Sequence, residues 1–187
     1  MVTSPTLPLP DATQICVGCA MCCNGTLYGR ARVAIGEERR IVDEGLELVK
    51  SEEKSYFRLP CRFESCGRCT IYETRFEVCR TFQCALLRRA EAGEIDLEKA
   101  SSIVAKAQDL LRAVVEGDRE AATNSGRYDV RARLAEDIKR APDEDRGSVA
   151  QRLLNIIALD TYLERWFRNK KPAPQGAEEG SDSVSNS

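Results

Sequence analysis

The 187-residue chain lacks histidine, has few aromatic residues and contains no long apolar run. Without histidine, an ordinary hydrolytic zinc site with an open coordination position is disfavoured. No stretch approaches the roughly 20 apolar residues that span a bilayer, and the opening MVTSPTLPLP resembles no signal peptide. A net charge of −2 gives no global field for nucleic acid. We therefore expect a cytoplasmic protein that binds neither nucleic acid nor membrane.

The chain has nine cysteines instead, all in its first half. The first cluster is a C-x-x-C-x-x-C-C run formed by Cys16, Cys19, Cys22 and Cys23. The second cluster consists of Cys61, Cys66, Cys69, Cys79 and Cys84. In a reducing compartment such thiols serve metal ligation or redox chemistry, and an odd count without an export signal disfavours structural disulfides. The sequence predicts a metalloprotein.

The spacing of the first cluster fits two kinds of metal centre. A C-x-x-C knuckle places two sulfurs on the same side of a turn, as in structural zinc sites. Three cysteines spaced C-x-x-C-x-x-C also match the run that holds three corners of an iron–sulfur cube. The cofactor is therefore expected to be zinc or an iron–sulfur cluster, and spacing leaves both open.

Cys22 and Cys23 are adjacent, and neighbouring side chains tend to point in different directions. One sulfur is therefore expected to serve the first centre, while the other serves a second centre, bridges two metals or stays a free reactive thiolate. Eight cysteines would complete two four-thiolate sites with Cys66 to spare; the predicted ligands are Cys16, Cys19, Cys22, Cys23, Cys61, Cys69, Cys79 and Cys84.

Arginines are interleaved with the second cluster. Between Arg58 and Arg89 there are seven arginines and three glutamates, in a chain whose overall charge is negative. Because a zinc ion bound by four thiolates carries about −2, guanidinium groups nearby would offset its charge. Arg80, directly after Cys79, is the first candidate for this role, and the alternative is a basic face for an acidic partner.

Alternation predicts strands at residues 27–35 and 56–59 in the cysteine-rich half. A helix is expected over residues 37–49, although Gly45 weakens it, and another over 83–92 that ends at Gly93. Helical spacing then predicts three longer helices: residues 97–117 capped by Asp96, residues 128–141, and a last helix beginning at Ser148. Their apolar stripes are typical of helices that pack on one another.

The predicted fold class is thus α+β and mainly helical. Residues 14–92 are expected to form a cysteine-rich half with short strands that is held together by bound metal. This half packs on an antiparallel helical hairpin or small bundle formed by residues 93–170. Residues 1–13 are rich in Pro and Thr, residues 171–187 combine Pro, Gly, Ser and acids, and both segments are expected to be disordered. The helices could also bind a protein partner or a second copy of the chain.

Four segments of the chain carry a family resemblance: CVGCAMCC, LPC, GRCTIYETR and VCRTFQC. In this order they are similar to the YkgJ-like proteins, a zinc- or iron-chelating group with a CxxCxxCC motif, over roughly residues 14–90. The resemblance implies the same eight ligand positions and matches Tyr72, Arg75 and Arg80 to other motif positions. The family usually has proline after the motif arginine, where this chain has Phe76.

Three functions remain open from the sequence. The first is a metal-binding module whose catalytic activity is unproven, which is favoured because the sequence has no Gly-rich nucleotide loop or methyl-donor motif. The second is an iron–sulfur redox enzyme or accessory subunit. The third is metal storage or delivery, for which thiolate ligands are suitable but a helical half is unnecessary.

Overall fold

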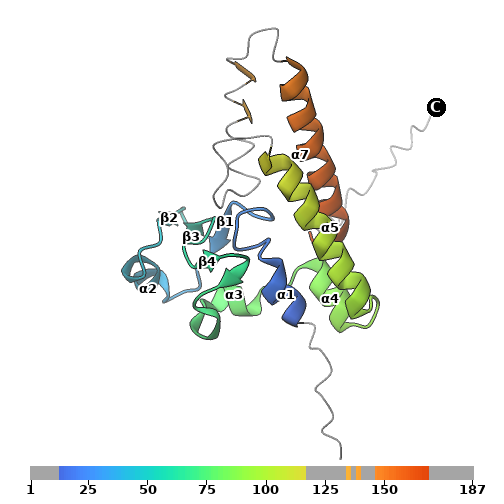
Figure 1. Cartoon of the computed structure of the whole chain (residues 1–187). Coiled ribbons are helices and arrows are strands. Elements are labelled where there is room, and N and C mark those ends of the chain that lie inside the picture. The colour runs from blue at the N-terminus through green and yellow to red at the C-terminus, as the bar shows by residue number, and fades with distance from the viewer. Residues whose placement is uncertain (1–12, 117–133, 136–137, 140–145, 169–187) are drawn as a thin grey trace, which may run out of the picture.

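The computed structural model describes residues 13–116, 134–135, 138–139 and 146–168. Figure 1 shows the strands and most short helices on one side and a pair of long helices on the other, with the short helix α4 at the lower end of α5. The short elements are α1 (Thr13–Cys19), β1 (Arg30–Arg32), α2 (Glu38–Asp43), β2 (Leu48–Lys50), β3 (Ser55–Arg58), β4 (Glu64–Ser65), β5 (Arg68–Cys69), the 3-10 helix η1 (Tyr72–Thr74), α3 (Glu77–Thr81) and α4 (Ala85–Glu91). The long helices are α5 (Leu97–Glu116) and α7 (Arg146–Trp166). The fold is α+β and mainly helical, as the sequence predicts.

The sheet of the cysteine-rich half has the order β1-β3-β2, and both pairs are antiparallel. Because successive side chains of a strand alternate between faces, Phe57 on β3 and its partner Ala31 on β1 share one face. Phe57 is buried there, whereas Tyr56 lies on the opposite face with its partner Arg32. β4 and β5 form a separate hairpin. Its tip contains Cys66 and Gly67, both at positive φ.

Two hydrophobic clusters organise the described residues. The helical core joins α5 and α7 to Met21, Leu27 and Leu86, and Cys19, Cys22 and Cys84 pack against it. The sheet core contains five buried residues, Val33, Ile41, Leu46, Phe57 and Phe76, and Cys61 and Cys79 pack against it. The cysteines thus lie at the edges of two different cores.

The predicted helix over residues 37–49 is only half right. α2 ends at Asp43, and the chain then turns at Gly45, whose φ of +72° favours glycine. Leu48–Lys50 instead forms β2, which pairs with β3. The predicted strand over residues 27–35 is also shorter than expected, because only Arg30–Arg32 pairs with a neighbour. Ile35 lies beyond its end and is 96% exposed.

The long helices agree better with the sequence pattern. α5 begins after Asp96, whose Oδ1 accepts a hydrogen bond from the Lys99 amide at 2.7 Å, as an N-cap residue does. α7 begins at Arg146, two residues before the predicted Ser148, and runs antiparallel to α5 (Figure 1). Most of the predicted helix over residues 128–141 lies outside the described residues.

Three apolar side chains of α7 are exposed: Leu153, Leu154 and Ile157. Binding of a partner or a second copy through these helices stays a prediction. Among the described residues no helix is long and apolar enough to cross a membrane. The cytoplasmic location and the proposed domain limits also stay predictions.

Candidate metal centres

The C-x-x-C-x-x-C-C run begins on a helix and ends in a turn. Cys16 and Cys19 are three residues apart on α1, which places their side chains on one face of the helix. α1 ends at Cys19, and the next residue, Ala20, has a φ of +52° that reverses the chain. The amide of Cys23 donates to the Ala20 carbonyl at 2.9 Å, which closes the turn. Helix and turn together bring Cys22 back towards the α1 cysteines.

The first group of thiols, here called the first quartet, consists of Cys16, Cys19, Cys22 and Cys84. Cys22 interacts electrostatically with the other three members more strongly than with the adjacent Cys23, and Cys84 also influences Cys16 and Cys19. All four, together with Cys23, line one cavity of about 50 Å³ at the edge of the helical core. The second cysteine cluster therefore contributes one thiol, Cys84, to the group that begins on α1.

Cys84 is placed by the start of α4. It is the N-cap residue of this helix, and its Sγ accepts a hydrogen bond from the amide of Leu87 at 3.4 Å. Amide-to-sulfur hydrogen bonds and the positive end of a helix dipole both stabilise a thiolate. Cys19 has a comparable partner in the amide of Met21. Two members of the first quartet thus have backbone donors suited to the charge of a metal ligand.

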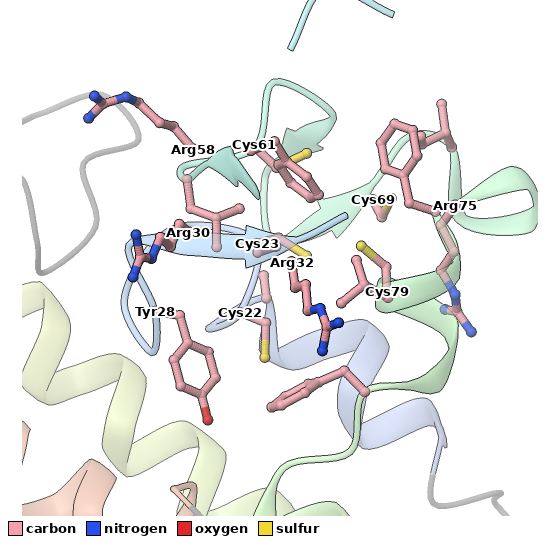
Figure 2. Close-up of a pocket in the computed structure, with 18 of the residues that line it drawn as sticks. Cys22, Cys23, Tyr28, Arg30, Arg32, Arg58, Cys61, Cys69, Arg75 and Cys79 are labelled. Atoms are coloured by element: carbon pink, nitrogen blue, oxygen red, sulfur yellow. The ribbon is translucent and has the colours of Figure 1, made fainter. Parts of the chain in front are cut away.

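The second quartet consists of Cys23, Cys61, Cys69 and Cys79. The groups that most affect Cys23, apart from burial, are the other three members. The amide of Cys61 donates to the Cys23 carbonyl at 2.7 Å, so the two segments are in direct contact. Cys69 comes from β5 and Cys79 from α3. Figure 2 shows Cys23, Cys61, Cys69 and Cys79 around one cavity.

Burial is the main cause of the raised thiol pKa values in both quartets. It raises the pKa of Cys19 and of Cys79 from 9.0 to about 12, and neighbouring thiols add to the effect at both. The pKa values of Cys22 and Cys23 are also raised, by burial first and then by their quartets. Because an ion must displace protons from such thiols, metal binding here is coupled to proton release.

All nine cysteines are free thiols. Among the described residues, no three cysteine or carboxylate side chains stand close enough together to hold an ion as they are. The quartets are therefore groups of neighbouring thiols, and their sulfurs would have to move inwards to coordinate a metal. The chemistry of the donors, thiols with backbone amides beside them, fits zinc and iron–sulfur centres.

The arginine best placed to influence the thiols is Arg75. It interacts electrostatically with Cys16 of the first quartet and with Cys69 and Cys79 of the second. Its Nε is buried without a hydrogen-bond partner, which leaves a donor for a negatively charged centre. Arg80, the candidate named from the sequence, is exposed. The sequence could have identified Arg75, because this residue ends the C-x-I-Y-E-x-R segment that carries the family resemblance.

Cys66 lies apart from both quartets. It is exposed at the tip of the β4–β5 hairpin, at a φ of +50°. Its Sγ lies 4.0 Å from the Ser65 hydroxyl oxygen. Its role as the spare cysteine stays a prediction.

A family model matches residues 15–107, a range that contains both quartets. Its description is "CxxCxxCC: Putative zinc- or iron-chelating domain". No curated protein and no solved structure matches the chain. Residues 15–107, which contain both quartets, therefore form a domain of the CxxCxxCC family.

Proposed function

We propose that the protein binds metal at two separate thiolate centres. The first centre uses Cys16, Cys19, Cys22 and Cys84, and the second uses Cys23, Cys61, Cys69 and Cys79. Each centre takes a zinc ion or an iron–sulfur cluster. The role of the metals is to hold the cysteine-rich half in its folded form.

The observation that carries this proposal is the separation of Cys22 from Cys23. Cys22 packs against the helical core and interacts mainly with Cys19, Cys84 and Cys16. Cys23 interacts mainly with the three cysteines of the sheet side. Eight thiols therefore divide into two groups of four, the number that a closed tetrahedral zinc site or an iron–sulfur cluster requires.

The stabilising role is supported by what each quartet connects. The first quartet joins α1 to the start of α4, and the second joins the turn after α1 to β5 and α3. The strands are two to four residues long, and the sheet core has only five buried apolar residues. A core of this size gives little stability by itself, and a structural metal adds binding free energy directly to folding.

The test is the metal content of the protein purified without oxygen. We expect about two zinc ions per chain in a colourless protein, or iron with acid-labile sulfide in a brown one. Cys84→Ser and Cys69→Ser should each remove the metal of one centre and keep that of the other. Cys66→Ser is the matched control and should keep both.

Two results would contradict the proposal. A wild-type protein that contains no bound metal would exclude both centres. If Cys84→Ser and Cys69→Ser each abolished all metal while the variants stayed folded, the eight thiols would form one shared site rather than two.

A further inference from the structure

The cavity that the second quartet borders is much larger than an ion needs. Its volume is about 720 Å³, which lies in the range of small-molecule sites. Its walls are largely apolar, with aromatic side chains that include Tyr28, Phe76 and Phe82. A space of this size and lining suits an organic molecule with an apolar body.

Arginines gather along the sheet side of this cavity. Arg30 lies directly opposite Arg58 in the β1–β3 register, and Arg32 lies opposite Tyr56. All four side chains therefore belong to the same face of the sheet. Like charges placed opposite each other on neighbouring strands are destabilising. Figure 2 shows the Arg32 side chain between Cys22 and Cys79, whereas the side chains of Arg30 and Arg58 extend to the left, away from the labelled cysteines.

Of the three arginines on this face, Arg58 alone has a salt-bridge partner among the described residues. Arg58 pairs with Glu47 at 2.8 Å, and both side chains are well exposed. The guanidinium carbon of Arg30 stacks at 4.3 Å from the centroid of the Tyr56 ring. Among the described residues, neither Arg30 nor Arg32 has a salt-bridge partner, and no Asp or Glu lines the cavity. The only formal charges on its described walls are positive, apart from what a bound metal centre brings.

The charge of the metal centres does not account for Arg30 and Arg32. The arginine that most affects thiols of both quartets is Arg75, and the one that affects Cys84 is Arg88. Arg30 and Arg32 are not among the main influences on the seven cysteines whose pKa is raised. Both side chains are exposed and line the cavity, so they are available to an anion that enters it.

We propose that this cavity binds a small organic oxyanion, a carboxylate or a phosphate ester on an apolar body. The anionic group contacts Arg30 and Arg32 at the sheet. The apolar body lies against the aromatic side chains, on the side of the second quartet. The ligand site goes beyond the proposed metal binding and does not depend on which metal is present.

The test compares three ligands with one ring system by titration calorimetry on the metal-loaded protein: 2-naphthoate, 2-naphthyl phosphate and the uncharged 2-naphthamide. We expect at least one anion to bind at least tenfold more tightly than the amide. Arg32→Gln and Arg30→Gln should each lower the affinity for that anion about tenfold, which is the effect expected when one charged hydrogen bond is lost. Arg39→Gln is the matched control, because Arg39 is exposed on α2 and does not line the cavity.

Each result decides the proposal. Preference for 2-naphthoate supports a carboxylate ligand, and preference for 2-naphthyl phosphate supports a phosphate ester. Equal binding of the amide, or full affinity in Arg30→Gln and Arg32→Gln, would overturn it. Metal is measured in each variant, and a loss of metal in Arg30→Gln or Arg32→Gln without weaker anion binding would assign these arginines to the thiolates instead. Absence of metal from the wild type would refute the proposed metal binding but not the anion site.

Discussion

The guanidinium carbon of Arg75 lies 3.8 Å from the centroid of the Tyr72 ring. A cation over an aromatic face is attracted by the negative charge density of the ring, which holds the guanidinium in place. From this position Arg75 interacts with Cys16 of the first quartet and with Cys69 of the second. One cation is therefore placed to offset negative charge at both proposed centres.

Arg75→Gln should weaken metal binding at both centres without removing a ligand. The loss of a group that contacts ligands typically lowers metal affinity by about 10- to 100-fold. The measurement is a competition titration with a coloured chelator. Arg80 is exposed and follows Cys79 in the sequence, so the Arg80→Gln variant should bind metal like the wild type. If the two variants lost affinity equally, the special position of Arg75 would be refuted.

Loss of each centre should loosen a different part of the fold. Cys84→Ser is expected to speed amide hydrogen exchange in α1 and α4, because the first quartet joins these helices. Cys69→Ser should speed exchange in β3, β5 and α3 around the sheet core. The readout is hydrogen exchange by mass spectrometry, with Cys66→Ser as the control. The same pattern in both cysteine variants would argue against two independent centres.

The metal-free and metal-loaded proteins should respond to pH in opposite ways. Burial raises the pKa of Cys19 and Cys79 from 9.0 to about 12, so the folded state favours the neutral thiol. In chelator-treated protein this contribution to stability is complete below pH 9 and is lost as pH rises towards 12. In loaded protein the ligands are thiolates, and protons displace the metal as pH falls.

Urea unfolding of both forms at about pH 6, 8 and 10 measures this effect. Chelated protein that folds should be less stable at about pH 10 than at pH 8, and loaded protein less stable at about pH 6 than at pH 8. Equal stability of the chelated form at the two higher pH values would contradict the thiol assignment.

Packing of the long helices gives a prediction that does not involve metal. Leu159 on α7 is fully buried in the helical core, whereas Leu154 on the same helix is 59% exposed. Leu159→Ala should lower the free energy of unfolding by about 2–5 kcal/mol, because it leaves a cavity. Leu154→Ala should change it by less than about 0.5 kcal/mol. Urea unfolding of both variants measures this difference. Similar losses of unfolding free energy would contradict the assignment of Leu159 to the core and of Leu154 to the surface.

The long elements could be predicted because their signals are local. Asp96 supplies the cap of α5, and apolar residues repeat at helical spacing along it. At residues 37–49 the local pattern was insufficient, because Leu48 and Val49 also fit a helix. Their actual conformation depends on pairing with Phe57 and Tyr56 of β3, which no local pattern contains.

The sequence named eight candidate thiols but not their arrangement, and their role as metal ligands stays a prediction. Because neighbouring side chains diverge, Cys22 and Cys23 were expected to differ: one would serve the first centre, and the other a second centre, a bridge between two metals or a free thiolate. Which distant cysteine joins which group depends on the packing of α4, which brings Cys84 to α1. The arginines on one face of the sheet could not be predicted either, because Arg30 and Arg58 become neighbours only through the strand register.

The division of Cys22 and Cys23 between the quartets also has a consequence for how the protein takes up metal. The two residues share one peptide unit, so coordination at either centre fixes backbone angles that the other centre also needs fixed. The first ion thus lowers the conformational entropy that the second must overcome. If the two proposed centres form, filling is expected to be concerted: at limiting metal, empty and doubly occupied chains would outnumber chains with a single occupied centre.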